Sequence, residues 1–406
     1  MPRLLYLIVS ALLVLSCGSR AEAKSDIVAA ESAVTATSDA VREVLVGATD
    51  TLSYMPQLRT RRVAVLANHT AMFSDTEHIV DMMHASGINI VGIFAPEHGF
   101  RGSIEAGAVV SNSVDERTGI KILSLYTGNT KRPSDEVMRS FDVLVVDMQD
   151  VGLRFYTYYI TLLQLMDACA DFGVEVVVLD RPNPNGHYVD GPLLDMKYKS
   201  GVGWAPIPVV HGLTMGEIAT MAVGEGWIRS VRLSVVKCRN YDHKTHYVLP
   251  IAPSPNLPTQ HSIYLYPSTC LFEGTVLSMG RGTDAPFEIY GHPAMKGCDF
   301  EFVPMPNAGS KTPPHNGVRC YGYDLRGLSD EDIWREGINI GYLVDAYHNL
   351  NMGEKFFKPV FEKLIGVGYV REMIIAGATA EEIEARWSED VERFKVQRRP
   401  YLLYAE

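Results

Sequence analysis

The chain has 406 residues, of which 47% are hydrophobic and 21% are charged, and its formal net charge is −11. This composition is that of a globular protein and excludes a largely disordered chain. The acidic balance, without a basic block, argues against nucleic-acid binding. The six cysteines form no Cys-x-x-Cys pair and are too few for a disulfide scaffold.

Residues 1–20 have the pattern of a secretory signal peptide. A positive start at Arg3 is followed by an apolar run over residues 4–15, which is too short to span a bilayer. Cys17 comes almost directly after this run and resembles the lipidated cysteine of a bacterial lipoprotein; plain cleavage is the alternative. Both predict export, to the periplasm or to a membrane-anchored form. Residues 21–47 are predicted to be a tether.

Strand and helix patterns alternate over the first half of the chain. Strands are predicted over residues 62–67, 88–94, 121–125, 142–147, 174–179, 207–210 and 232–236, and helices over residues 40–46, 75–85, 158–172 and 215–224. Nearly continuous Val, Ile and Leu strands between helices are typical of a parallel sheet covered on both faces. The fold class is therefore predicted to be α/β.

The residue composition and the pattern of predicted elements change near residue 250. Four prolines fall between Pro250 and Pro258, which indicates a boundary or a structured loop. Short strands, Gly-rich turns and charged helices follow, among them a helix predicted over residues 380–394. We predict a second, smaller α/β (α+β) domain there. Its Cys298 and Cys320 are candidates for a disulfide that the sequence does not establish, whereas Cys169 is predicted to be a buried thiol.

Polar residues follow five of the predicted strands. They are Asn68 and His69, residues 95–102, residues 148–156, residues 180–186, and His211 with Gly212. Ligands of open parallel sheets bind beyond the carboxyl ends of the strands, so these residues predict a polar pocket at that edge.

Several common catalytic motifs do not occur. There is no Gly-x-Gly-x-x-Gly after the first strand, no Walker loop, no Gly-x-Ser-x-Gly and no His-Glu-x-x-His. The carboxylates, arginines, amides and tyrosines that remain suit a sugar with an acid group. Carboxyl groups move protons at a glycosidic bond, and arginine binds a carboxylate through two parallel hydrogen bonds.

The loop motifs resemble the exo-β-N-acetylmuramidase family (NamZ-like). The first is Ala-Pro-Glu-His-Gly-Phe-Arg-Gly at residues 95–102. Others lie at residues 147–158, 179–185, 190–193, 212–217, 253–258, 266–275, 278–284 and 399–404. The resemblance runs from about residue 48 to the end; His187 departs from it, standing where the family is expected to have glycine.

The resemblance implies a Rossmann-like catalytic domain at residues 48–262 and an auxiliary domain at residues 263–406 that contributes to the cleft. It also implies hydrolysis of non-reducing-end β-1,4-linked N-acetylmuramic acid from peptidoglycan fragments. No cofactor and no metal are expected, and no protein partner is inferred.

Three carboxyl groups are candidate catalytic groups: Glu97, Glu273 and Asp150. The resemblance points to Glu97, and burial beside strand ends would raise its pKa as a general acid requires; its alternative is a structural turn cap. Glu273 is alternatively a contact between domains. Asp150 is alternatively a helix cap or an ion-pair partner of Arg154. The choice between a retaining and an inverting reaction stays open, because it depends on the separation of the two carboxyl groups.

The candidate substrate-binding residues lie in the same motif loops. They are Asn68, His98, Arg101, Arg154, Tyr156, Arg181, Asn183, His211, Asn256, Arg281 and Asp284. One of the four arginines is expected to bind the lactyl carboxylate of muramic acid, and internal ion pairs are the alternative for each. Turn formation is the alternative for Asn183, Asn256 and Asp284.

Two other functions remain open at this point. A metal-dependent amidase or deacetylase would draw its ligands from His69, His98, His211, Asp150 and Asp180, although their spacing matches no known metal motif. A lectin-like protein would bind peptidoglycan fragments without cleaving them.

Overall fold

The computed structural model describes residues 42–96, 100–101, 113–125 and 132–406. The predicted signal segment with Cys17, most of the tether, and Glu97 and His98 lie outside these residues. Within them, no helix combines the length and the apolar character that a membrane crossing requires.

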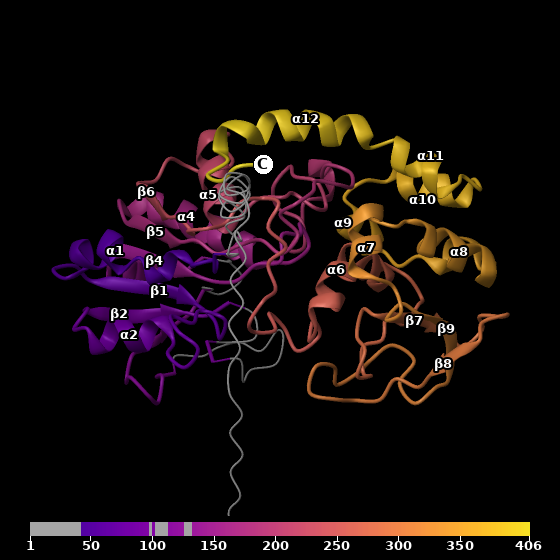
Figure 1. Ribbon diagram of the computed structural model, residues 1–406, viewed down its shortest axis with the longest axis horizontal. Helices are drawn as coiled ribbons and strands as arrows, with labels where there is room; N and C mark the ends of the chain where they lie inside the picture. The colour runs from indigo at the N-terminus through magenta and orange to yellow at the C-terminus, as the bar shows by residue number, and fades with distance from the viewer. Residues whose placement is uncertain (1–41, 97–99, 102–112, 126–131) are drawn as a thin grey trace, which may run out of the picture. The chain divides into compact units, whose positions relative to one another are not determined.

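A six-stranded parallel sheet forms the N-terminal half (Figure 1). Its strands are β1 (Val63–Ala67), β2 (Ile90–Phe94), β3 (Ile122–Leu123), β4 (Val143–Asp147), β5 (Glu175–Leu179) and β6 (Leu233–Val236). Their order is β3-β2-β1-β4-β5-β6, and Val63 of β1 lies opposite Ile90 of β2 and Val143 of β4. This is the Rossmann strand order, in which the direction of winding reverses between β1 and β4. The predicted fold class is confirmed.

Successive side chains of the strands pack alternately into two separate hydrophobic cores, one on each face of the sheet. Leu144 and Val146 of β4 pack into the core on the side of α4 and α5, whereas Val143 and Val145 pack into the core on the side of α1 and α2. Successive side chains of a strand point to opposite faces, so a strand covered on both faces is apolar throughout. The helices are α1 (Thr51–Leu58), α2 (Ile79–Ala85), α3 (Asp135–Met138), α4 (Tyr158–Phe172) and α5 (Met215–Gly224), with 3-10 turns η1 (Gly47–Thr49) and η2 (Met196–Tyr198).

Two predicted elements are wrong. Residues 207–210 do not join the sheet, and Val210 forms only isolated bridges to Leu153 and Asp190. Pro206 and Pro208 remove the amide donors that a ladder at this position needs. Of the helix predicted over residues 40–46, the described part is not helical, and Leu45 instead forms an antiparallel bridge to Arg239.

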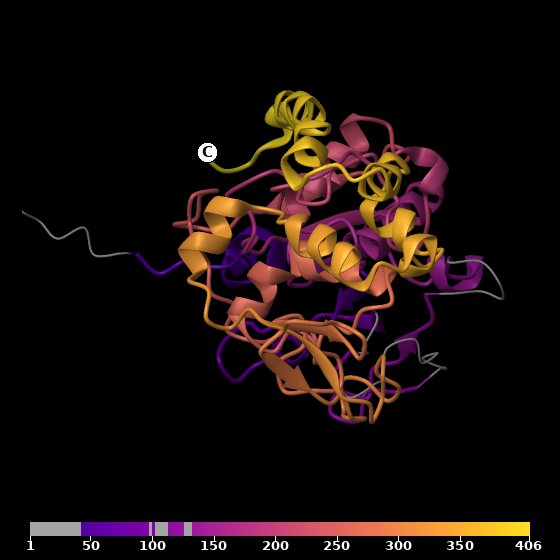
Figure 2. The same ribbon diagram turned by 90° about the vertical axis from the view of Figure 1, so that its right-hand side faces the viewer.

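The C-terminal half combines a small antiparallel sheet with short helices (orange to yellow in Figure 1 and, from a second side, in Figure 2). The strands β7 (Ile289–His292), β8 (Phe300–Phe302) and β9 (Cys320–Asp324) pair in the order β7-β9-β8. The helices are α6 (Gln260–Thr269), α7 (Asp330–Glu336), α8 (Gly341–Leu350), α9 (Phe361–Ile365), α10 (Tyr369–Ile375), α11 (Ala380–Ala385) and α12 (Ser388–Arg398), with 3-10 turns η3 (Cys270–Gly274), η4 (Gly353–Phe356) and η5 (Arg399–Tyr401).

The helix predicted over residues 380–394 is split into α11 and α12 at Trp387. The Trp387 indole is buried and donates from Nε1 to Asp190 Oδ1 at 3.0 Å. The five described cysteines are free, so Cys298 and Cys320 are not bridged, and Cys169 is buried as predicted.

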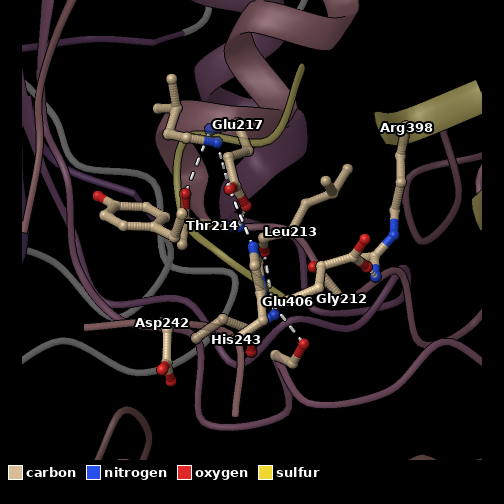
Figure 3. A network of polar contacts seen from close by, with 12 residues as sticks. Gly212, Leu213, Thr214, Glu217, Asp242, His243, Arg398 and Glu406 are labelled. Carbon is tan, nitrogen blue, oxygen red and sulfur yellow. Dashed lines mark hydrogen bonds and ion pairs between the residues drawn. The ribbon is translucent and has the colours of Figure 1, made fainter. Parts of the chain in front are cut away.

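The C-terminal tail, residues 402–406, returns to the carboxyl edge of the parallel sheet. Leu403 N donates to Glu217 Oε1 at 2.8 Å, and Tyr404 OH donates to Asp180 Oδ2 at 2.7 Å. Figure 3 shows Glu217 pointing at His243, whose Nε2 lies 2.9 Å from Glu217 Oε1, and Arg398 reaching Gly212 and Glu406. The end of the chain is thus part of the framework around the N-terminal sheet.

Replacing Tyr404→Phe is expected to lower the free energy of unfolding by about 1–3 kcal/mol. The hydroxyl donates to buried Asp180 and accepts from Cys238 N at 2.9 Å, so both groups lose a partner. Urea unfolding measures the change. Tyr401→Phe is the matched control, because its hydroxyl donates to Glu225 at the surface, and about 0.5 kcal/mol or less is expected there. Equal losses in the two variants would contradict this assignment.

Candidate active site

A cavity of about 210 Å³ lies between the start of α4, the Pro-rich loop and η3. It brings together four of the predicted site residues: Tyr156, Asn256, Glu273 and Arg281. Its full lining is Phe155, Tyr156, Thr157, Tyr158, Val202, Ser254, Asn256, Leu257, Tyr266, Glu273, Arg281 and Phe287. The walls therefore come from both halves of the chain.

An ion pair forms the charged wall of the cavity. Arg281 Nη2 and Nε donate to Glu273 Oε1 at 2.6 and 3.1 Å, and the guanidinium lies 5.1 Å from the centre of the Phe287 ring. Burial acts to lower the pKa of Arg281, but the Glu273 carboxylate outweighs it and raises this pKa. Burial also lowers the pKa of Lys358, an effect that Glu273 opposes. One carboxylate thus interacts with two cations.

Another part of the wall is aromatic. Tyr156 and Tyr158 meet edge to face with ring centres 4.7 Å apart, and their hydroxyls donate to Pro253 O at 3.0 and 3.5 Å. Burial raises the pKa of Tyr156 well above its ordinary value, so the phenol stays neutral. Asn256 is anchored by its side-chain amide, which donates to Gly309 O at 2.7 Å. Rings and amides in this arrangement suit a sugar with an N-acetyl group.

Asp284 does not line the cavity. Its side chain is exposed, and the preceding Thr283 hydroxyl donates to Gly280 O at 2.7 Å. This geometry agrees with the alternative that the segment is a turn.

A second group of predicted residues lies where the winding of the sheet reverses, after β1 and β4. Asn68 Oδ1 accepts from the Thr70 hydroxyl at 2.6 Å, and the Thr70 hydroxyl accepts from Gln149 N at 3.1 Å, which ties the two strand ends together. Asn68 Nδ2 and Asp150 Oδ2 are buried and have no hydrogen-bond partner among the described residues. Buried polar atoms without partners in a crevice of this kind indicate a place for a ligand.

Asp150 is a buried carboxyl group. Its Oδ1 accepts from Gly152 N at 2.7 Å. Burial raises its pKa to about 7, although backbone N–H groups oppose the shift. About half of the carboxyl groups therefore carry a proton at pH 7, so the protonated form that a general acid needs is well populated. Asp150 forms no ion pair with Arg154, whose guanidinium donates to backbone carbonyls. The backbone N–H of Tyr159, in the first turn of α4, is one of the groups that oppose the rise of the Asp150 pKa, which agrees with the helix-cap alternative.

Arg154 does not have the position expected of a substrate-binding residue. Its guanidinium is fully enclosed and donates to four backbone carbonyls, those of Pro192, Ile207, Leu364 and Ile365, at 2.7–3.0 Å. Burial lowers its pKa to about 10. Because these carbonyls belong to segments far apart in the sequence, Arg154 holds the two halves of the chain together.

Two further arginines have internal partners too, in their case carboxylates. Buried Arg181 donates to both carboxylate oxygens of Asp147 at 2.5 and 3.0 Å. Arg101 bridges Asp81 and Asp115 at 2.8–3.2 Å. Of the four predicted arginines, Arg281 is the one that lines the cavity.

Asn183 and His211 are occupied largely by the protein itself. Asn183 Nδ2 donates to Leu213 O at 3.0 Å, and its Oδ1 accepts from Asn185 N at 2.8 Å, as in the turn-forming alternative. His211 Nδ1 accepts from Leu213 N at 3.1 Å, and its buried Nε2 has no partner among the described residues. Burial lowers the pKa of His211 to about 3, so the ring is neutral. The part of the chain that the structure describes contains no group of three or more His, Cys, Asp or Glu residues placed to hold a metal ion.

Comparison with known proteins places the chain in a family. Models of the N-terminal and C-terminal regions of exo-beta-N-acetylmuramidase NamZ match residues 63–261 and 264–404. A Bacillus subtilis (strain 168) protein named peptidoglycan beta-N-acetylmuramidase NamZ is 37% identical over 377 residues, which cover 87% of this chain and 90% of that protein. The chain belongs to the exo-beta-N-acetylmuramidase NamZ family.

Two solved structures of Bacteroides fragilis NCTC 9343, both titled DUF1343 family proteins, have the same fold. One superposes with a TM-score of 0.85 at 54% identity, covering 90% of this chain and all of its own. The other gives 0.74 at 27% identity, covering 89% of this chain and 99% of its own. The family fold therefore extends across both halves of the described chain.

Some residues of the site were not predicted. Ser254 and Phe287 line the cavity, and Lys358 interacts with its ion pair. Ser254 lies within the motif at residues 253–258, which carried the family resemblance, so the sequence already indicated this segment. Lys358 lies outside every such motif, and only the fold brings it to Glu273. Glu97 and His98 lie outside the described residues, so their roles stay predictions.

The Asp150→Asn variant is expected to remove one component of the pH dependence of stability. Because burial raises the pKa of Asp150 to about 7, its stabilising contribution is complete below about pH 4 and is lost as the pH rises through 7. Between pH 4 and 8 the wild type should therefore lose on the order of a few kcal/mol relative to the Asn variant, measured by urea unfolding. The exposed Asp284→Asn variant should follow the wild type, and parallel curves for Asp150→Asn would refute the protonated state.

Proposed function

We propose that this protein is an exo-acting glycoside hydrolase that releases N-acetylmuramic acid from the non-reducing ends of peptidoglycan fragments. The observation that carries the proposal is the match to the NamZ family over both halves of the chain, with 37% identity to the B. subtilis peptidoglycan beta-N-acetylmuramidase. The cavity supports it, since its walls combine aromatic rings, an amide and a carboxylate–guanidinium pair.

Glycoside hydrolysis requires a proton donor and a second carboxylate that acts as nucleophile or base. Asp150, with its pKa raised to about 7, is partly protonated at neutral pH and can supply a proton, and Glu97 is the donor that the family resemblance favours. Glu273 stands on the cavity wall, where it forms an ion pair with Arg281. We assign Glu273 the role of the second carboxylate.

Arg281 is our candidate for binding the lactyl carboxylate. Its guanidinium lines the cavity and contacts only one oxygen of Glu273, whereas the other three candidate arginines are held by internal partners. Lys358 adds a second positive charge beside Glu273. Arg281, Lys358 and Glu273 together therefore have one positive charge in excess. Asn256 and Tyr156 are positioned for the N-acetyl group and the sugar ring.

We also propose that the protein is exported. The support is the sequence of residues 1–20, with an apolar run and Cys17 directly after it. Lipidation of Cys17 would keep the enzyme at a membrane, with residues 21–47 as a tether, and cleavage without lipidation would release it to the periplasm. Peptidoglycan fragments are accessible in both cases.

The function is tested with the disaccharide N-acetylmuramic acid-β-1,4-N-acetylglucosamine and the chain without residues 1–24. Free N-acetylmuramic acid should appear in mass spectra, and a chelator should not prevent this. Glu97→Gln should reduce turnover by at least about 100-fold while substrate still binds, because general acid–base catalysis contributes this much. If the wild type binds the disaccharide but releases no N-acetylmuramic acid, the lectin alternative is favoured. If the chelator abolishes the activity, the metal-dependent alternative is favoured.

Replacing Arg281→Ala is expected to raise KM for muramic substrates by about tenfold or more, because a charge-assisted hydrogen bond to the lactyl group is lost. Substrates that end in N-acetylglucosamine lack this carboxylate, so their KM should change little. Arg326→Ala is the matched control, since Arg326 pairs with Asp324 outside the cavity. An unchanged KM ratio between the two substrates would remove Arg281 from substrate recognition.

A further inference from the structure

A second cavity, of about 430 Å³, opens at the amino edge of the parallel sheet, opposite the candidate active site. Its walls include Arg61, Arg62, Arg139 and Arg232, and the half-buried ring of Phe172 forms a small apolar floor. We call it the arginine pocket. Arg61 and Arg62 directly precede β1, and Arg232 directly precedes β6. The strands separate this edge from the carboxyl edge by roughly 15 Å.

Two of the arginines are fixed by carboxylates. Arg61 Nη1 donates to Glu175 at 2.8 Å, and Arg62 binds Asp142 through Nη2 and Nε at 2.7 and 3.2 Å. Arg62 Nη1 also donates to Arg139 O at 3.0 Å. These bonds hold the wall of the pocket in a defined geometry before any ligand arrives.

The other two guanidinium groups keep most of their donors available. Arg232 donates to Gly173 O at 3.1 Å and has no carboxylate partner among the described residues. Arg139 has a long contact of 3.7 Å to Asp135, and both side chains are at least 70% exposed, so this pair is weak. The Arg139 guanidinium lies 4.9 Å from the centre of the Phe172 ring, which orients it beside the apolar floor.

The positive charge of the pocket contrasts with the chain as a whole, whose net charge is −11. Counting Asp135, Asp142 and Glu175 against the four arginines leaves an excess of one positive charge. The volume falls within the range of about 300–1,000 Å³ that small-molecule sites occupy. Guanidinium groups at an apolar floor match a compact anion with a carbon skeleton.

We propose that the arginine pocket binds a small molecule bearing a carboxylate or phosphate group, at a site separate from the active site. Arg139 and Arg232 bind the oxyanion, and Phe172 contacts the carbon skeleton. Arg61 and Arg62, with their carboxylate partners, shape the wall.

The test is calorimetric titration of the full-length protein with inorganic phosphate, phenyl phosphate and citrate at low ionic strength. Saturable binding of at least one probe is expected, and added salt should weaken it because the arginines are exposed. Tighter binding of the phosphate probes than of citrate would assign phosphate as the ligand group, and the reverse order would assign carboxylate. An absence of saturable binding for all three probes would overturn the proposal.

Variants locate the bound anion. The double variant Arg139→Ala/Arg232→Ala should weaken binding by about tenfold or more. If the double Ala variant does not fold, the double variant Arg139→Gln/Arg232→Gln takes its place, because glutamine keeps hydrogen-bonding capacity at both positions. Arg229→Ala is the matched control, because Arg229 is an exposed arginine already paired with Asp167 and Asp171 and does not line the pocket. Arg281→Ala should also leave the affinity unchanged. Wild-type affinity in the double variant, or loss of binding in Arg281→Ala, would overturn the proposal.

Discussion

The buried carboxylate of Asp180 is the constraint on which the arrangement of the two halves depends. It follows β5 directly, is fully enclosed, and accepts from the Thr214 hydroxyl, Gly216 N and the Tyr404 hydroxyl at 2.7–2.8 Å. A buried carboxyl group costs several kcal/mol unless such donors satisfy it. Burial raises its pKa to about 6, and the Thr214 and Tyr404 hydroxyls limit the rise. The start of α5 and the end of the chain must therefore meet at β5.

The same edge carries the candidate active site, and its loops are fixed by one another. Arg154, Asn183 and Asn185 each donate to backbone carbonyls of neighbouring loops, so the frame does not depend on a ligand. Within that frame, single atoms of Asn68 and Asp150 are left without partners among the described residues. A rigid frame with a few unsatisfied polar atoms is the arrangement that electrostatic preorganisation requires, since these groups need not reorganise when charge develops.

The sequence predicted the sheet well because its strands are buried on both faces. Continuous Val and Leu residues mark each of β1, β4 and β5, and the apolar pattern of α4 and α5 gave their bounds as observed. The segment at residues 207–210 has a similar apolar character, but its prolines exclude it from the sheet. The local apolar pattern therefore distinguishes strands from helices. Whether an extended segment joins the sheet depends in addition on its backbone N–H donors, which proline lacks.

The site was predicted less completely, and the arginines show why. Arg154, Arg181 and Arg281 all lie in similar motif loops, and nothing in their local sequence separates them. Their roles are set by distant partners: Arg154 reaches carbonyls at Leu364 and Ile365, more than 200 residues away, and Arg181 reaches Asp147. Such contacts become visible only when the chain is folded.

Charge in this protein acts locally. The net charge of −11 opposes the approach of an anionic glycan, but at physiological ionic strength this repulsion is screened beyond about 8 Å. At the cavity the charges of Glu273 and Arg281, with Lys358 interacting with Glu273, are partly desolvated. They are therefore screened much less, and a carboxylate meets an excess of positive charge. In the function that we propose, discrimination between a muramoyl end and a glucosaminyl end, which differ by one carboxylate, depends on these few side chains and not on the overall charge.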